Sequence, residues 1–238
     1  MRRIQYFLIV LLLIFLIPNE YAEALTINTG FSTEEFSEDE LNTFITNFEI
    51  SMLTYEPEKR VIECFDVNEK GLIAIGCASS ENKTICIYSN DGIFQYGYSF
   101  KSYGSFGIKF DENSIIIYLV RSSVAVSVNL AGEIEGALRI LETYENNTYW
   151  NKSVFAKKRE VSGTEYTLRN NMGIFNLFAS SYSQLVALDI NGEESILYDV
   201  SSTHMAKMIV MSVCILLFVS VVVYFVAREF VRLKNNAK

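Results

Sequence analysis

The feature that most constrains this chain is a run of twenty residues without a charge, from Met208 to Ala227. Twenty helical residues at about 1.5 Å each extend for roughly 30 Å, which is the thickness of the hydrocarbon core of a bilayer. A helix buried in a soluble core is the alternative. Every face of the run is apolar, and Lys207 and Arg228 bound it, so the sequence predicts a transmembrane helix over residues 208–227.

A second, shorter apolar run near the N-terminus is typical of a secretory signal peptide. Arg2 and Arg3 precede the apolar residues 7–17, and residues 22–24 form an A-x-A cleavage pattern. An uncleaved N-terminal anchor is the alternative, but the run falls short of the roughly 20 apolar residues that a span requires. We therefore expect residues 1–24 to be removed after export.

Basic residues indicate how the chain is oriented. The tail 228–238 carries four Lys and Arg side chains against the single acid Glu229. Positive residues beside a span stay on the cytoplasmic side. We expect a single-pass protein of the cell membrane, with residues from 25 onward outside the cytoplasm, a juxtamembrane linker at 201–207 and a cytoplasmic tail at 228–238.

The exported segment is acidic. Residues 25–205 hold 25 acidic and 13 basic side chains, a net charge of −12. Binding to DNA or RNA requires clusters of Lys and Arg that neutralise phosphates. The sequence therefore predicts no nucleic-acid partner.

Three stretches between residues 61 and 200 share one layout. In each, a leading strand is followed by an apolar strand, a short polar link, a second apolar strand with a glycine-bearing turn, and a last strand. Val, Ile, Tyr and Phe are frequent there and favour strands over helices. The expected segments are 61–67, 72–78, 84–92 and 93–100 in the first unit, 105–110, 114–120, 124–132 and 133–140 in the second, and 166–170, 174–180, 184–192 and 193–200 in the third.

The turns of these units support antiparallel pairing. Asn90-Asp91-Gly92 and Asn191-Gly192 are strong hairpin sequences, because Asn, Asp and Gly tolerate positive φ. The layout over residues 61–200 resembles the blade of a β-propeller, nearest to the NHL-like and related six-bladed types. The resemblance implies a mainly β fold of about three four-stranded antiparallel blade-like repeats, and it brings no catalytic or ligand-binding residue with it.

Three repeats are too few for a closed ring, since propellers normally have at least four blades. We expect either an open stack of sheets or a partial propeller whose exposed end is covered by another chain. An ordinary twisted antiparallel sheet or sandwich is the alternative.

The segment 25–60 is expected to hold one short helix and a lead-in strand. Ser37 and Glu40 form a capping box, and a helix over 37–48 follows. A strand is expected within 48–55. The acids near the helix start suit the helix dipole and lack the spacing of a calcium loop. One apolar face of the helix is formed by Leu41, Phe44, Ile45 and Phe48.

An insertion at residues 141–163 separates the second and third units. Residues 154–161 and 164–170 flank Ser162-Gly163 and are expected to pair as a hairpin. Aromatic side chains next to cations favour recognition surfaces. Packing of the aromatics on the third unit, with solvated cations, is the alternative. The candidate partner-binding residues are Tyr149, Trp150, Phe155, Lys157, Lys158 and Arg159.

The exported segment has few of the residues from which catalytic or metal sites are built. The single histidine, His204, lies just before the membrane, so no Ser-His or Cys-His pair is expected. Cys64, Cys77 and Cys86 lack metal-ligand spacing; two of them pairing as a disulfide and all three lying buried as thiols are both open. We expect no cofactor and no catalytic activity.

These observations favour a non-catalytic membrane protein. Its extracytoplasmic β domain is expected to bind or scaffold a cell-envelope protein or a second copy of itself, with the membrane contacted through residues 208–227. The alternative is a sensor of a small ligand or carbohydrate. A tail as short as 228–238 would then require a signalling partner in the membrane.

Overall fold

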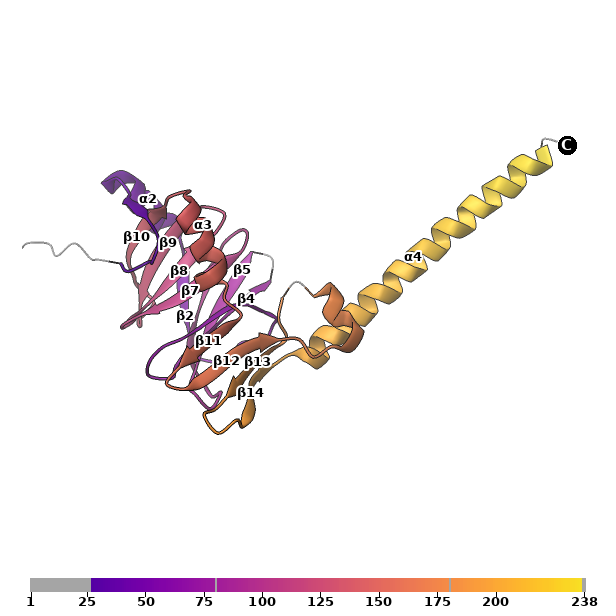
Figure 1. Cartoon of the computed structure of the whole chain (residues 1–238). Coiled ribbons are helices and arrows are strands. Elements are labelled where there is room, and N and C mark those ends of the chain that lie inside the picture. The colour runs from indigo at the N-terminus through magenta and orange to yellow at the C-terminus, as the bar shows by residue number, and fades with distance from the viewer. Residues whose placement is uncertain (1–26, 80, 180, 237–238) are drawn as a thin grey trace, which may run out of the picture.

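A computed structural model describes residues 27–79, 81–179 and 181–236 of the chain. It contains three antiparallel sheets, of five, five and four strands, and a long C-terminal helix that leaves them (Figure 1). The predicted mainly β fold class is thereby confirmed. The expected signal peptide at 1–24 lies outside the described residues.

The first sheet has both faces buried. Its β4 alternates between two hydrophobic cores, with Ala74 in one and Ile73 and Ile75 in the other. Because side chains alternate across a strand, such a continuously apolar strand requires a layer on each side. In spatial order its strands are β2 (Ile50–Leu53), β6 (Phe94–Lys101), β5 (Asn82–Tyr88), β4 (Ile73–Ser79) and β3 (Ile62–Val67).

The second sheet packs on one face of the first. Ile115, Ile117 and Leu119 of its strand β8 point into the shared core, while Ile116 and Tyr118 point to the opposite face. In spatial order its strands are β1 (Thr33–Glu35), β10 (Ile134–Ile140), β9 (Val124–Asn129), β8 (Ser114–Leu119) and β7 (Phe106–Asp111).

The third sheet packs on the other face of the first sheet, through residues that include Tyr166, Leu185 and Tyr198. The predicted hairpin around Ser162-Gly163 is present, although its first strand begins only at Lys158. In spatial order the strands are β11 (Lys158–Val161), β12 (Thr164–Arg169), β13 (Gln184–Leu188) and β14 (Glu194–Asp199).

The strand predicted at 174–180 is wrong. Residues Gly173–Phe178 form a 3₁₀ helix, η2, instead. The Asn176 side chain accepts a hydrogen bond from the Met172 backbone N–H at 2.8 Å and holds the turn at its start. Ile174 and Leu177 are three residues apart, the spacing at which 3₁₀ side chains align, and both are exposed rather than paired in a sheet.

The first strands of neighbouring units meet edge to edge. The Glu63 carboxylate on β3 accepts a hydrogen bond from the Phe106 N–H on β7 at 3.0 Å, and Asp66 accepts one from the Phe110 N–H at 2.8 Å. These carboxylates satisfy donors that an edge strand would otherwise leave open. The three sheets do not close into a propeller.

The short helix α2 (Glu38–Asn47) has the predicted capping box between Ser37 and Glu40. Leu41, Phe44 and Phe48 pack on the core between the first two sheets. The expected fourth member of that face, Ile45, is 37% exposed and turns toward solvent.

The insertion is helical in part, whereas the sequence predicted helices only over 37–48 and 208–227 and a hairpin within the insertion. It contains α3 (Tyr144–Tyr149) and a π-helical turn, η1 (Trp150–Val154). The Thr143 hydroxyl accepts a hydrogen bond from the Asn146 N–H and caps α3.

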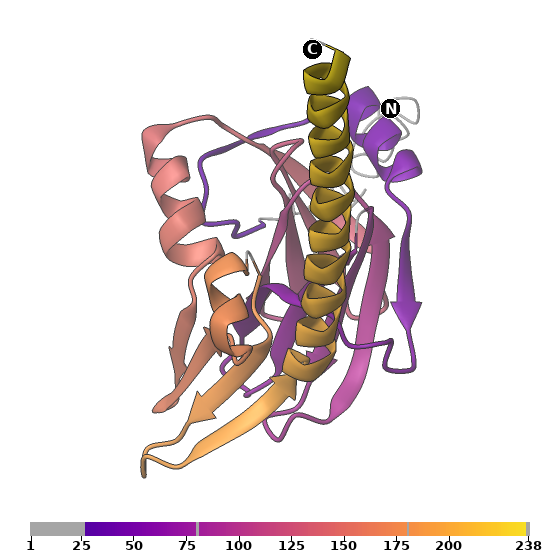
Figure 2. The same ribbon diagram turned by 90° about the vertical axis from the view of Figure 1, so that its right-hand side faces the viewer.

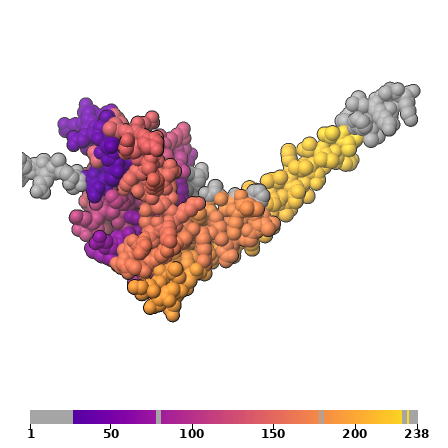
Figure 3. Space-filling model, in the orientation of Figure 1, coloured from indigo at the N-terminus to yellow at the C-terminus, as the bar shows by residue number. Residues whose placement is uncertain are grey.

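The C-terminal helix α4 runs without a break over Ser201–Asn236. The expected linker at 201–207 is therefore helical, in keeping with the absence of Gly and Pro from this stretch. Within the described residues it is the one helix long and apolar enough to cross a membrane, over Ser201–Arg228, and the apolar 18-residue stretch within it is not buried. The helix projects away from the sheets (Figure 3).

Candidate interaction surfaces

The aromatic residues of the insertion form a cap on the outer face of the second sheet. The ring of Phe31 lies 4.6 Å from the rings of both Tyr149 and Trp150. Trp150 in turn lies 5.8 Å from Tyr118 and 5.9 Å from Phe155. The aromatics therefore pack on the second sheet, not on the third unit that we considered from the sequence.

A buried amide ties this cap to the N-terminal segment. The Asn146 side chain donates to the carbonyls of Ser32 and Leu141 at 2.9 and 2.7 Å, and accepts from the Ser32 N–H at 2.9 Å. The Tyr118 hydroxyl donates to the Thr29 carbonyl at 2.6 Å. Residues 29–32 and the insertion thus cover the second sheet as one unit.

The basic run does not form one surface, because it enters a strand and alternates. Lys157 places its Nζ 5.5 Å from the ring centre of Tyr182. Lys158 forms an ion pair with Glu165 of the neighbouring strand. Arg159 points to the opposite face of β11, toward the first sheet. Partner binding by the six insertion residues stays a prediction.

Arg159 pairs with Asp66 where β3, β7 and β11 approach one another. Its Nε lies 3.1 Å from the Asp66 carboxylate, and its guanidinium lies over the Phe65 ring. This Nε is buried and has no hydrogen-bond partner among the described residues. Burial raises the pKa of Asp66, while the Phe110 N–H and Arg159 act in the opposite direction.

A cavity of about 700 Å³ opens beside this ion pair. Acids and cations line it together: Asp66, Glu69 and Glu112 on one hand, and Lys70 and Lys109 on the other. The remaining lining residues are Val67, Asn68, Phe110, Asn113 and Val161.

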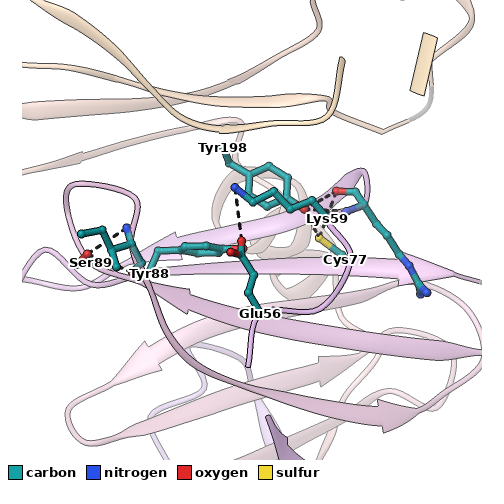
Figure 4. Close-up of polar contacts among 8 residues, drawn as sticks. Glu56, Lys59, Cys77, Tyr88, Ser89 and Tyr198 are labelled. Atoms are coloured by element: carbon teal, nitrogen blue, oxygen red, sulfur yellow. Dashed lines mark hydrogen bonds and ion pairs between the residues drawn. The ribbon is translucent and has the colours of Figure 1, made fainter. Parts of the chain in front are cut away.

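The connection at residues 56–60, called the strap below, makes polar contacts with both the first and the third sheet near the start of α4 (Figure 4). The Tyr88 hydroxyl donates to Glu56 at 2.9 Å, and Lys59 approaches the same carboxylate at 3.4 Å. The Lys59 ammonium also lies 5.1 Å from the ring centre of Tyr198. The Tyr198 hydroxyl donates to the Arg60 carbonyl at 2.7 Å and accepts from the Arg60 N–H at 2.8 Å. The strap therefore fixes β14, and with it the base of α4, to the domain.

A small basic pocket adjoins this strap. Its volume is about 160 Å³, and Lys59, Arg60, His204 and Lys207 supply its nitrogen-bearing side chains. The first two come from the strap and the last two from α4. Val61, Val200 and Thr203 complete the lining.

The cysteines of the β domain are free and buried. Cys64, Cys77 and Cys86 form no disulfide, so the thiol alternative is the one observed. Burial raises the pKa of Cys77 to about 11 and that of Cys86 to about 12, and raises that of Cys64 well above its usual range. Thiols held protonated in this way are poor nucleophiles. Over the described ranges, no three His, Cys, Asp or Glu side chains gather as a metal site.

The outer face of the third sheet is only partly exposed: Gln184 and Val186 on this face are buried, whereas Leu188 and Ile196 reach solvent. Leu188 is 38% exposed and Ile196 is 53% exposed. Ion pairs and hydrogen bonds surround them: Arg169 contacts Gln184 and Glu194 at 3.0 and 2.7 Å.

No protein-family model, no curated protein and no solved structure matches the chain. The surfaces above are therefore interpreted from their own geometry.

Sequence reasoning missed the Asp66–Arg159 site and the strap. One sequence pattern could have indicated the Asp66–Arg159 site, because Glu63 and Asp66 interrupt an otherwise apolar strand, β3. An acid inside such a strand calls for a buried partner. The identity of that partner depended on how strands of three different units meet.

Proposed function

We propose that this chain is a non-catalytic, single-pass membrane protein whose extracytoplasmic β domain binds a protein partner of the cell envelope. In this proposal, the three sheets are the blade-like units of an incomplete propeller of the NHL-like type. The observation that carries the proposal is the contrast between the two ends of the stack. Residues 29–32, α3 and η1 cover the second sheet, whereas the outer face of the third sheet exposes Leu188 and Ile196 beside the buried Val186.

The partly exposed outer face of the third sheet has the composition of a contact surface. Leu188 and Ile196 lie on the same side of neighbouring strands, since their cross-strand partners Glu194 and Val186 share that side. Ile190, 84% exposed, extends the apolar area into the turn that follows β13. Polar groups around an apolar centre are the usual anatomy of a protein interface.

A different protein is the better partner than a second copy. The net charge of −12 on residues 25–205 repels an identical domain, whereas it attracts a partner with a basic surface. Binding next to α4 would hold that partner at the membrane.

The topology is tested by protease added to intact cells that make the protein. We expect the β domain to be degraded while the tail 228–238, tagged at its end, stays attached to a protected fragment. The basic tail supports this orientation. Full protection of the β domain in intact cells, with digestion after lysis, would overturn the orientation.

The partner surface is tested by a photo-crosslinking amino acid at position 196, with position 130 as the matched control. Leu130 is 50% exposed, close to the 53% of Ile196, but lies in the second sheet's β9–β10 turn. We expect one discrete adduct from position 196 and none from position 130. An adduct of twice the monomer mass would instead identify a second copy as the partner. No adduct from position 196 would remove this face from the proposal.

The runner-up function, a sensor of a small ligand or carbohydrate, is favoured by the cavity beside Asp66 and Arg159. Its volume of about 700 Å³ suits a small molecule. This function becomes the better account if the β domain is monomeric and captures no envelope protein.

A further inference from the structure

The connection between β12 and β13 presents two bare apolar side chains on η2. Ile174 is 76% exposed and Leu177 is 85% exposed. In a 3₁₀ helix, side chains three residues apart lie one above the other, so the two form one apolar ridge. Single exposed apolar residues are common on protein surfaces. This ridge differs from such residues because it lies next to the start of α4.

Hydrogen bonds tie the segment that carries η2 to the first residue of α4. The Asn171 N–H donates to the Ser183 hydroxyl at 3.2 Å, and that hydroxyl lies 2.9 Å from the hydroxyl of Ser201. The Ser183 carbonyl also accepts from the Val200 N–H at 2.9 Å. In both views of the ribbon, the short orange helix η2 lies beside the first turns of α4 (Figures 1 and 2). The ridge is thus held at a fixed place next to the helix.

The proposed membrane span fixes the level of the bilayer at the same place. Lys207 is the last charged residue before the apolar run. From Ser201 to Lys207 the helix rises only about 9 Å along its axis. Because η2 lies beside the first turns of α4 (Figures 1 and 2), the hydrocarbon core begins a short distance from η2. The small pocket at this level gathers Lys59, Arg60 and Lys207 on a domain that is otherwise acidic. Cations at this depth attract lipid phosphates.

We propose that the β domain rests on the bilayer that α4 crosses, with Ile174 and Leu177 inserted in the extracytoplasmic interfacial layer and Arg60 and Lys207 facing phosphates. This inference rests on the proposed single-pass topology. Two contacts, α4 and η2, fix the orientation of the domain, which α4 alone leaves free to rotate and tilt. The third sheet is then presented at a constant height, where a partner embedded in the same membrane can reach it.

The test places a tryptophan on the ridge and measures its quenching by lipids brominated on the acyl chains. The full chain is reconstituted in phosphatidylcholine nanodiscs with Leu177→Trp, and Ile190→Trp is the matched control. Ile190 is 84% exposed and sits at the end of the third sheet away from α4. The native Trp150 gives the same background in both variants and in the unchanged protein.

We expect the added emission of Leu177→Trp to fall about twofold or more in brominated discs, since interfacial side chains reach about 5–10 Å into the acyl boundary. The added emission of Ile190→Trp should not change. Ile174→Trp repeats the measurement at the other ridge position in case Leu177→Trp does not fold.

Co-flotation of the protein with lipid vesicles separates the two proposals. A protein that floats with vesicles but shows equal, unquenched emission at positions 177 and 190 spans the membrane without docking on it, and overturns this inference alone. A protein that does not float with vesicles overturns the membrane span and the docking together.

Discussion

Replacing Trp150 with alanine is expected to lower the free energy of unfolding by about 3 kcal/mol, at the lower end of the range for large aromatic truncations. The indole is only partly buried, which places it at that end. It contacts the rings of Phe31, Tyr118 and Phe155 on the outer face of the second sheet. Loss of the indole opens a void under the cap and exposes the apolar residues of β8 to solvent.

Urea unfolding followed by circular dichroism measures this effect, with Tyr144→Ala as the matched control. Tyr144 belongs to the same insertion but is 82% exposed, so its truncation should change stability by less than about 0.5 kcal/mol. Equal stabilities of the two variants would contradict the cap. Loss of the position-196 adduct from a fully stable Trp150→Ala protein would instead make Trp150 a recognition residue.

The sequence predicted the strands best where turn chemistry and alternation agree. Gly92 and Gly192 take φ values of 78° and 82°, as the Asn-Gly and Asp-Gly turns require, and strands flank each of them. The capping box of α2 was likewise readable, because Ser37 and Glu40 interact within one turn. Local interactions of this kind are fully specified by neighbouring residues.

The wrong predictions concern segments whose structure depends on tertiary contacts or whose apolar spacing is compatible with more than one secondary structure. Residues 174–178 have apolar side chains one and three apart, which a strand and a 3₁₀ turn can both hold, and the Asn176 contact selects the turn. The aromatics of the insertion were identified, but the sheet on which they pack was not. Their partner Phe31 lies more than a hundred residues earlier in the chain, and the packing surface considered from the sequence was the third unit, not the second sheet.

The Asp66–Arg159 pair carries the second large expected effect. Arg159→Met keeps most of the side-chain volume but removes the cation beside a poorly solvated carboxylate. Removing one partner of a buried ion pair typically costs about 3–5 kcal/mol, because the remaining charge is uncompensated. The neighbouring Lys158→Met variant is the matched control. Its ion pair with Glu165 is exposed, and such pairs contribute about 0–1 kcal/mol.

The cost of Arg159→Met should depend on pH in a defined direction. Burial raises the pKa of Asp66 in the folded protein above its unfolded value, and loss of Arg159 removes an interaction that lowers it. The folded state of the variant therefore binds a proton at a higher pH than the unfolded state does. Its stability relative to the unchanged protein should rise as pH falls from 7 through the folded pKa toward about 4, near the ordinary value for Asp.

A background in which Asp66 is already neutral isolates this carboxylate from the many other acids of the domain. In Asp66→Asn, the amide oxygen can still accept from the Phe110 N–H, so the edge of β7 keeps its partner. Adding Arg159→Met to Asp66→Asn should then cost much less than Arg159→Met alone, and the difference should not vary with pH. Urea unfolding of the four proteins at pH 7 and at acidic pH completes the cycle. A pH-independent penalty for Arg159→Met, equal in both backgrounds, would mean that Arg159 acts by packing over Phe65 rather than by neutralising Asp66.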